Sequence, residues 1–283
     1  MAHCIVPDAE AVLDEEFRVH DKGFIRLVDY LGGDSRIVQA ARVSYGDGTK
    51  TVREDAGLID YLLRNEHTSP FEQVVLTFHI KMPIFVARQW IRHRTARVNE
   101  ISGRYSVMKD EFWLPAPDAL ARQSADNKQG RESEPLPPAE AAEAIGLLEA
   151  GQRAAYASYM ALVDSGLARE LARVNLPLSM YTEWYWQIDL HNLFRFLALR
   201  MDAHAQREIR DYAAVLFDIA KRVCPLACAS FERNTLGGVR LSSDEAAAVK
   251  TLLEGGDAGL GARDLERLSE KLANATAKKG TLH

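Results

Sequence analysis

The segment from Gln73 to Arg94 constrains the fold of this chain more than any other. Its first part, Gln73–Met82, is rich in β-branched and aromatic side chains and predicts a strand. Pro83 suits the first position of a helix, where its missing N–H loses no hydrogen bond. A helix to about Arg94 is expected to follow, and its predicted buried side chains are Ile84, Phe85, Val86, Trp90 and Ile91.

The other segments predict further strands separated by helices. With more helix than strand, this pattern favours an α/β or α+β fold. Asp34 or Ser35 is expected to cap the first helix, and Asp189 the helix that leads to Arg200. The predicted strands are Gly23–Leu31, as the first in the chain, and Met180–Ile188; the predicted helices are Asp34 or Ser35 to Ser44, about Val52 to Asn65, Pro138 or Ala139 to about Gly166, Ala168–Val174, His191–Arg200 and Gln206–Val223.

Changes in composition divide the chain into three segments. Residues 1–20 form an acidic lead-in, and residues 21–234 hold most of the predicted elements. Residues 235–283 are polar, with two expected helices, and look like a C-terminal helical extension. Within the middle segment, residues 113–138 contain five prolines around a polar run, which predicts a long surface loop.

The composition is that of a soluble globular protein. The 283 residues are 47% hydrophobic and carry a net charge of −5, which argues against a broad nucleic-acid-binding surface. No apolar run approaches the roughly 18 residues that suggest a membrane span, and the N-terminus lacks a signal pattern. The three cysteines, Cys4, Cys224 and Cys228, indicate neither a disulfide framework nor a metal site. We therefore expect a cytoplasmic protein that binds no metal.

The segment Arg88–Ser106 concentrates positive charge in this acidic chain. It contains one acid, Glu100, and five arginines: Arg88, Arg92, Arg94, Arg97 and Arg104. Arginine offers a planar fork of donors that suits phosphate and carboxylate groups. The polar residues among and after them could hydrogen-bond a ring or a sugar: Asn99, Glu100, Ser102, Gly103 and Tyr105. A solvated helix end, where the helix dipole favours cations, is the other interpretation that these residues leave open.

Three histidines are further candidates. His67 lies with Ser69 and Glu72 in a polar turn between two predicted elements, where functional residues concentrate, although it could also face solvent. His79 lies inside the predicted strand and is expected to be packed there. The arginines on either side of His93 would lower its pKa by like-charge repulsion, so this ring is expected to stay neutral.

Three arginines stand in apolar contexts: Arg173, Arg195 and Arg200. A buried arginine needs an anion or a carboxylate beside it. That partner could be an Asp or Glu of the same chain, or a bound ligand. Together with the arginines of Arg88–Ser106, these three suggest a site for more than one phosphate group.

The segment Arg92–Ser106 closely resembles the signature of the flavin-dependent thymidylate synthases. With x for any residue, that signature is Arg-His-Arg-x-x-Ser-x-Asn-x-x-Ser-x-Arg-Tyr, in which the first Ser is usual. This chain departs from the signature only at Arg97, where the family most often has that Ser. Four further blocks resemble the same family in the right order: His67–Glu72, Pro83–Trp90, Glu170–Leu178 and Leu197–Gln206. The resemblance covers about Asp21 to Phe231.

This resemblance implies a reaction, its cofactors and an assembly. The family methylates deoxyuridine monophosphate (dUMP) to thymidine monophosphate, with methylenetetrahydrofolate as the carbon donor. FAD reduced by NADPH supplies the hydride. The implied assembly is a homotetramer with active sites built by several subunits. Each subunit is expected to be a single catalytic domain, here residues 21–234. Its implied fold is α/β (α+β), with a mixed, largely antiparallel sheet flanked by helices.

The resemblance also implies roles for individual residues. Those expected to face FAD are His67, Ser69, Glu72, Arg92, His93, Arg94, Asn99, Glu100, Asp189, His191 and Arg195. Those expected to hold dUMP are Gln89, Arg92, Glu100, Ser102, Gly103, Arg104, Arg173 and Arg200. Arg200, Ser102 and His67 are the expected catalytic residues, and Arg200 is expected beside the pyrimidine carbonyl. Arg97 is expected to point toward a phosphate or solvent.

Two other functions remain open on the sequence. One is a flavin-dependent reductase of another nucleotide-like substrate. The other is a nucleic-acid-binding protein without catalytic activity, whose binding would weaken strongly with salt.

Overall fold

The computed structural model describes residues 4–44, 52–125 and 130–277. Internal contacts divide the chain into two compact units. The first comprises Met1–Gly46 and Ser69–Val223, and the second comprises Asp47–Thr68 and Cys224–His283. The segment boundaries expected after residues 20 and 234 stay predictions.

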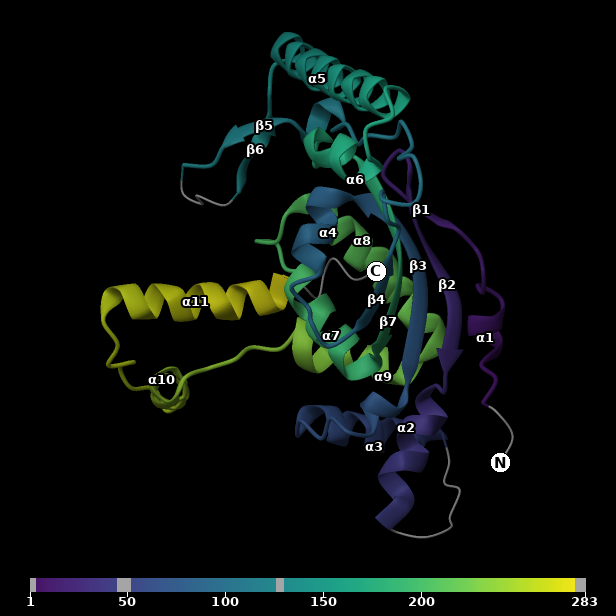
Figure 1. Cartoon of the computed structure of the whole chain (residues 1–283). Helices are drawn as coiled ribbons and strands as arrows, with labels where there is room; N and C mark the ends of the chain where they lie inside the picture. The colour runs from purple at the N-terminus through teal and green to yellow at the C-terminus, as the bar shows by residue number, and fades with distance from the viewer. Residues whose placement is uncertain (1–3, 45–51, 126–129, 278–283) are drawn as a thin grey trace. The chain divides into compact units, whose positions relative to one another are not determined.

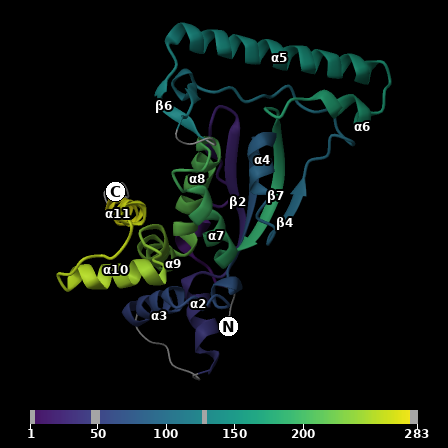
Figure 2. The ribbon, with the colours of Figure 1, turned by 90° about the vertical axis from the view of Figure 1, so that its left-hand side faces the viewer.

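A five-stranded sheet forms the centre of the first unit (Figures 1 and 2). Its strand order is β1-β2-β3-β7-β4, and all four strand pairs are antiparallel. The strands are β1 (Phe17–Val19), β2 (Gly23–Leu31), β3 (Val75–Pro83), β7 (Tyr181–Asp189) and β4 (Arg97–Glu100). The prediction of a helix-and-strand fold with a largely antiparallel sheet is therefore confirmed.

The long strands were predictable and the short ones were not. The strand expected at Gly23–Leu31 is confirmed at both ends, but β1 precedes it, so it is not the first strand. The expected strands at Gln73–Met82 and Met180–Ile188 are confirmed with ends shifted by one or two residues. β1 and β4 span three and four residues, too few for an alternating pattern to be recognised.

The helix after β3 is shorter than expected. α4 spans Ile84–Trp90, so the prediction of a helix to Arg94 is wrong. Ile91, expected to be buried, is 47% exposed. The His93 N–H donates to the Trp90 carbonyl at 3.0 Å, an i to i+3 bond that closes the last turn. Residues 91–94 therefore leave the helix as a polar segment.

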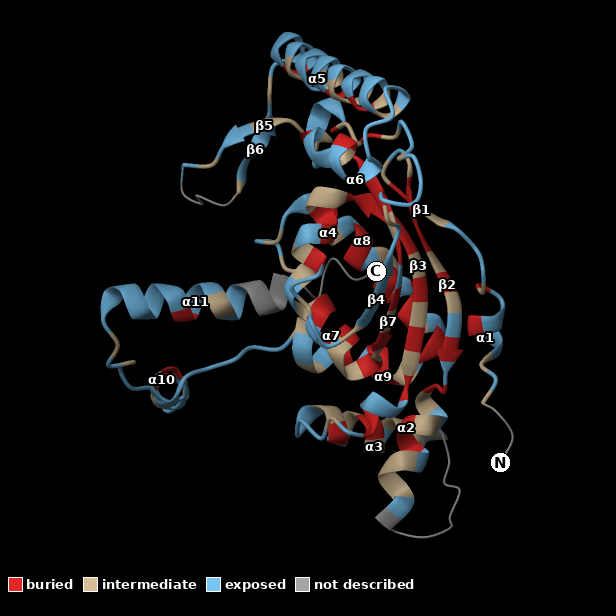
Figure 3. Cartoon of the chain, in the orientation of Figure 1, coloured by how far each residue is buried: buried red, intermediate tan, exposed pale blue. Residues whose placement is uncertain are grey.

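Three helices cover one face of the sheet: α4, α7 (Leu190–Arg200) and α8 (Arg207–Val223). Figure 3 shows buried residues along β3 and β7 and on the facing sides of these helices. The centre of this core is aromatic. The Trp90 ring lies 4.7 Å from Phe196 and packs edge-on against Trp184, Trp186 and Tyr212, at 5.2 to 6.0 Å between centroids. This cluster joins the end of α4 to β7, α7 and α8.

The other sheet face carries polar and aromatic side chains. His79 on β3 stacks on Tyr185 of β7, with 4.8 Å between ring centroids, and its Nδ1 accepts a hydrogen bond from Arg26 at 3.1 Å. Burial and then the charge of Arg26 lower the pKa of His79. The prediction that His79 is a packed strand residue is confirmed.

The Pro-rich segment is not a plain loop, and in this respect the prediction for residues 113–138 is wrong. It contains the short turn η3 (Pro117–Ala119) and an antiparallel pair, β5 (Ala121–Gln123) and β6 (Arg131–Pro135). Arg131 ties this pair to α8, because both its Nη atoms donate to Oε1 of Glu208 at 3.1 Å. Glu208 is almost fully buried, so this ion pair is protected from solvent.

The remaining elements of the first unit are short, except for α5. They are α1 (Pro7–Glu10), α2 (Asp34–Ala41), η1 (Arg42–Ser44), η2 (Phe71–Gln73), α5 (Pro138–Asp164), α6 (Arg169–Ala172) and η4 (Arg173–Asn175). The predicted capping of α2 by Asp34 or Ser35 is wrong: its N-cap is Gly33, without a side-chain cap.

The second unit is helical in its described residues. It contains α3 (Val52–Arg64), α9 (Pro225–Phe231), the π-helical turn η5 (Glu232–Leu236), α10 (Ser243–Leu253) and α11 (Ala262–Ala277). Asp60 of α3 accepts hydrogen bonds from Ser230, Arg233 and Asn234, which join it to α9 and η5. Buried Glu245 of α10 accepts from Lys271 of α11 at 2.7 and 2.9 Å. Neither unit has, within its described residues, a helix of the length and apolarity that crossing a bilayer requires.

The predicted cap of α7 is confirmed and gives a test of stability. Oδ1 of Asp189 accepts from the Asn192 N–H at 2.9 Å. Asp189→Ala should lower the free energy of unfolding by about 1 kcal/mol, because an N–H of the first turn loses its acceptor. Asp189→Asn is the matched control, since asparagine caps about as well. Urea denaturation measures both; equal stability of the alanine variant and the parent would contradict the capping role.

Candidate active site

One group of predicted residues lies where β7 ends and α7 begins. Its members are Ser69, Glu72, Asp189, His191 and Arg195. The turn η2 packs on α7 through Phe71 and Phe194, whose ring centroids are 6.4 Å apart. Ser69, Glu72 and Arg195 are exposed, and the other two are half-buried. We call these five residues the α7-start group; they form a polar surface around the first turns of the helix.

A second group lies at the other end of α7 and consists of Gln89, His93 and Arg200. The Nε of Arg200 donates to Nε2 of His93 at 3.0 Å. Its Nη2 donates to the backbone carbonyl of Gln89 at 3.1 Å. This α7-end group therefore joins three residues that lie up to 111 positions apart in the sequence. Arg200 is partly buried, as expected from its aliphatic surroundings.

His93 is a neutral hydrogen-bond acceptor in this group. Arginine has only donors, so Nε2 of His93 must accept and the ring proton must lie on Nδ1. Burial, then the charges of Arg200 and Arg195, lower the pKa of His93 to about 4. The direction of this shift confirms the sequence-based expectation, but its cause differs. The charges that act on the ring come from α7 and not from the two arginines adjacent to His93 in the sequence.

Arg200 finds no carboxylate in the described part of the chain. Its two acceptors are the His93 ring and a backbone carbonyl, and both are uncharged. The alternative of an ion pair with Asp or Glu of the same chain is therefore wrong for the described residues. Burial lowers the pKa of Arg200, yet arginine stays charged in proteins. The site holds a partly buried cation without a compensating charge.

The edge strand β4 sends its side chains to two faces of the sheet. In the register of β4 and β7, Arg97 lies opposite Gln187 and Asn99 lies opposite Tyr185, so both side chains are on the sheet face opposite the helices. Glu100 lies on the helix-covered face, where its Oε1 accepts from the Thr182 hydroxyl at 2.6 Å. Asn99 and Glu100, both expected to contact FAD, therefore point in opposite directions.

A third group follows β4 and consists of Ser102, Gly103, Arg104 and Arg173. A Cβ on Gly103 would lie 2.9 Å from the Met108 sulfur and 3.1 Å from Cδ of Arg173, so a side chain here would displace these two flexible side chains. The Ser102 hydroxyl accepts from the Arg104 N–H at 3.3 Å. Arg104 also pairs with Glu170 at 3.2 Å, but both side chains are more than half exposed and the pair is weak. We call these four residues the β4-loop group.

Positive charge around these groups is left uncompensated. Among the arginines singled out in the sequence, six make no hydrogen bond or ion pair with any residue that the structure describes: Arg88, Arg92, Arg94, Arg97, Arg173 and Arg195. In a chain with five more acidic than basic residues, this local excess is not a consequence of composition. Such a cluster raises the local concentration of anions. The arrangement suits a ligand with several negative charges.

The structure brings some predicted residues together and leaves others apart. No hydrogen bond or ion pair between described residues joins the β4-loop group to Gln89 or Arg200. His67 belongs to the second compact unit, where its ring packs edge-on against Tyr61 at 5.8 Å. Its surroundings in that unit contain none of the other predicted site residues.

Sequence reasoning missed one residue of the α7-end group. Gln206, just before α8, accepts a hydrogen bond from Nε2 of Gln89. It is the last residue of the block Leu197–Gln206, which carried part of the resemblance. The signal was therefore present, but no local pattern indicated a contact over 117 positions.

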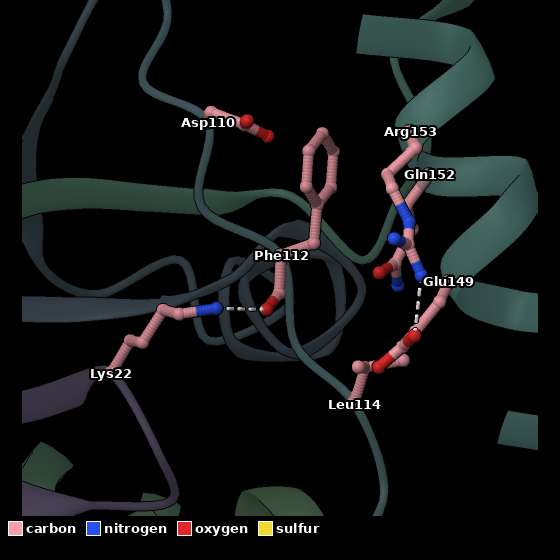
Figure 4. Close-up of a pocket in the computed structure, with 7 residues that line it drawn as sticks. All are labelled: Lys22, Asp110, Phe112, Leu114, Glu149, Gln152 and Arg153. Atoms are coloured by element: carbon pink, nitrogen blue, oxygen red, sulfur yellow. Dashed lines mark hydrogen bonds and ion pairs between the residues drawn. The ribbon is translucent and has the colours of Figure 1, made fainter. Parts of the chain in front are cut away.

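A cavity of about 250 Å³ has a lining that contains no residue of these groups (Figure 4). It is lined by Lys22, Asp110, Phe112, Leu114, Glu149, Gln152 and Arg153. Its cations already have partners, because Arg153 pairs with Glu149 at 2.6 Å and Lys22 donates to the Phe112 carbonyl at 2.9 Å. None of the predicted site residues lines it, so we do not place the site there.

Comparisons with known proteins agree on one family. The family model described as "Thymidylate synthase complementing protein" matches residues 26–226, a range that contains Arg92–Ser106 and the four supporting blocks. A flavin-dependent thymidylate synthase of Treponema denticola is 67% identical over 260 residues, covering 92% of this chain and 98% of the relative. One from Thermus thermophilus is 58% identical over 235 residues, covering 83% and 85%.

A solved structure is also similar. The UMP/dUMP methylase PolB from Streptomyces cacaoi, bound with 5-Br dUMP, superposes with a TM-score of 0.70 at 32% identity. The match covers 77% of this chain and 98% of that one. The fold around the candidate site is thus shared with an enzyme that acts on a pyrimidine nucleotide.

The neutral state of His93 predicts how stability depends on pH. In the unfolded chain this histidine binds a proton near pH 6.5, whereas in the folded chain it does so only near pH 4. Between these pH values the unfolded chain binds up to about one proton more than the folded chain. The free energy of unfolding should therefore fall as the pH falls from 6.5 to 4. His93→Gln, which still offers Arg200 an acceptor, should lose this part of the slope. Identical slopes for the two proteins in urea denaturation at several pH values would disprove it.

Proposed function

Because the chain belongs to the flavin-dependent thymidylate synthase family, we propose that it methylates dUMP to thymidine monophosphate. Methylenetetrahydrofolate is the carbon donor, and FAD reduced by NADPH is the hydride source. The observation that carries this proposal is the α7-end group, in which a partly buried, uncompensated Arg200 is held by a neutral His93. Such a cation is suited to a substrate that gains negative charge during the reaction.

The donors around α7 fit the flavin cofactor. FAD carries a diphosphate, and exposed guanidinium groups without acidic partners among the described residues are available to it at Arg92, Arg94 and Arg195. The residues that we propose to face FAD are His67, Ser69, Glu72, Arg92, His93, Arg94, Asn99, Glu100, Asp189, His191 and Arg195. The cofactor supplies the redox chemistry, so the protein needs only to bind and orient the flavin and the nucleotide and to polarise the nucleotide.

Arg200 stabilises the pyrimidine when it accepts electrons. Its Nε and one Nη2 hydrogen are taken by His93 and Gln89, which leaves the Nη1 group free to donate to a ring carbonyl. His93 orients the guanidinium without neutralising it, because the ring carries no charge above about pH 4. We assign Arg200, with Ser102 and His67, to the catalytic residues. No side chain is assigned as a covalent nucleophile.

The β4-loop group binds the nucleotide phosphate. Arg104 and Arg173 supply the charge, the Ser102 hydroxyl is a further donor, and Gly103 allows the backbone to approach. Gln89, Arg92, Glu100 and Arg200 complete the nucleotide site. Since no hydrogen bond or ion pair between described residues joins the β4-loop group to the α7-end group, we propose that different copies of the chain contribute them to one site. A homotetramer provides such shared sites.

The flavin and Arg200 give a first experiment. Purified protein should show a flavin absorption spectrum, directly or after reconstitution with FAD. Arg200→Ala should keep this spectrum and the tetramer but lower turnover of dUMP by at least about a hundredfold, because a preorganised donor to the developing charge is lost. Arg222→Ala is the matched control, since it removes an arginine from the last turn of another helix, α8. Turnover by Arg200→Ala equal to that of the control would refute the role of Arg200.

Sharing of sites between copies gives a second experiment. Arg104→Ala and Arg200→Ala should each be inactive alone. If each site takes Arg104 from one copy and Arg200 from another, random mixing of the two variants should give both arginines to about a quarter of the sites. The subunits are mixed after reversible dissociation of the tetramers. Recovery of up to about a quarter of the parent activity is therefore expected. Mixed tetramers without any recovered activity would show that both groups of one site belong to one chain.

A further inference from the structure

The loop that follows β4 carries most of the β4-loop group. At its start, the Ile101 N–H donates to the Glu183 carbonyl of β7 at 2.9 Å. Within it, the Ser102 carbonyl accepts from the N–H groups three and four positions later, at 3.1 and 3.4 Å, which closes a turn around Gly103 and Arg104. These bonds set the local shape of the turn. Its position in the molecule also depends on what holds the far end of the loop.

Two tyrosines of α5 hold the far end of this loop at Met108. The Met108 N–H donates to the Tyr159 hydroxyl at 3.0 Å, and the Tyr156 hydroxyl donates to the Met108 carbonyl at 3.0 Å. A backbone N–H can only donate and a carbonyl can only accept, so the direction of both bonds is unambiguous. Neither backbone group of Met108 has a backbone partner among the described residues. The two hydroxyls therefore satisfy the main chain of this loop residue.

The two tyrosines are themselves fixed on the first unit. Tyr159 is fully buried. One helical turn before Tyr156, the buried amide of Gln152 donates to the Trp113 carbonyl at 3.0 Å and to the Ser179 hydroxyl at 3.1 Å. The spacing of four and then three positions puts these three α5 side chains on one face of the helix. That face is the side by which α5 is attached, so the hydroxyls offered to the loop stand on a rigid support.

Met108 links this support to the proposed phosphate site. A Cβ on Gly103 would lie 2.9 and 3.2 Å from Sδ and Cγ of Met108, and 3.1 Å from Cδ of Arg173. The side chains of Met108 and Arg173 therefore both lie against Gly103. α5 also packs against η4, the turn that begins with Arg173. The same helix thus supports Arg173 from one side and holds the loop with Gly103 and Arg104 beside it.

We propose that Tyr156 and Tyr159 are positioning residues that hold the β4 loop against Arg173, so that the two sides of the site converge on the phosphate of the nucleotide. Both hydroxyls are occupied by Met108, so they act on the ligand only through the loop. Charge-assisted hydrogen bonds to a phosphate require donors that converge on one anion, and small displacements weaken them. Without the two hydroxyls, the next backbone bond to the sheet is at Glu111, whose carbonyl accepts from the first N–H of β7 at 2.9 Å. The inference rests on the proposed function, because it takes a nucleotide phosphate as the ligand of the β4-loop group.

Removal of the hydroxyls alone tests this role. Tyr156→Phe and Tyr159→Phe keep the aromatic rings, and each removes one hydrogen bond to Met108. The double variant removes both. Ser158→Ala is the matched control, because it removes a hydroxyl of the same helix that donates within the helix, to the Ala154 carbonyl at 2.9 Å. The flavin spectrum and urea denaturation show whether each variant is folded.

The measured quantity is the ratio of the dissociation constants of deoxyuridine and dUMP on the oxidised FAD-loaded protein. Calorimetry gives the constant for dUMP directly and that for deoxyuridine by competition with dUMP. The two ligands differ only in the phosphate, so a general loss of stability leaves the ratio unchanged. Each single variant should lower the ratio by about threefold or more, and the double variant by at least about tenfold, because dUMP binding weakens. Ser158→Ala should keep the parent ratio within about twofold.

The outcomes distinguish this inference from the proposed function. A parent protein that prefers dUMP to deoxyuridine, with the same ratio in the double variant, would overturn the inference and leave the proposed function intact. Equal weakening of both ligands would also overturn it, because the tyrosines would then support the whole site and not its phosphate side. If the double variant does not fold, the two single variants decide the same question. A parent protein that binds neither FAD nor dUMP would overturn both the inference and the proposed function.

Discussion

The packing of Trp90 is the constraint on which the rest of the site depends. This side chain is fully buried and contacts aromatic rings from β7, α7 and α8. It is also the last residue of α4, so the polar segment with Arg92, His93 and Arg94 starts directly beyond this aromatic cluster. The same cluster holds α7, whose last residue is Arg200. A packed core thus sets the distance between His93 and Arg200, although both are polar.

The charges of the site residues then determine which ligands can bind to them. Guanidinium groups that find no acid in the described chain repel one another, and they are tolerated when a ligand supplies the missing charge. Burial keeps His93 neutral, so it orients Arg200 and takes nothing from its charge. The family of the chain and the chemistry of these donors lead to the same class of ligand, a flavin dinucleotide and a nucleotide monophosphate.

Much of the fold could be predicted because it is encoded locally. β2, β7, α7 and the cap at Asp189 follow from alternation, helical spacing and one capping side chain. The end of α4 was misjudged because Ile91 continues the apolar pattern, whereas the helix ends where Trp90 fills the core. The β5–β6 pair was missed because prolines and polar residues conceal strands this short.

Within the site, the residue types could be named from the sequence, but their contacts could not. The hydrogen bonds from Arg200 to His93 and from Gln89 to Gln206 span 107 and 117 positions. They exist only after α4, α7 and α8 have packed together.

Release of tritium from the C5 position of dUMP, the carbon that gains the methyl group, tests the central claim most directly. With methylenetetrahydrofolate and NADPH, the FAD-loaded protein should release tritium in step with thymidine monophosphate formation, whereas FAD-loaded protein that releases none would contradict the account.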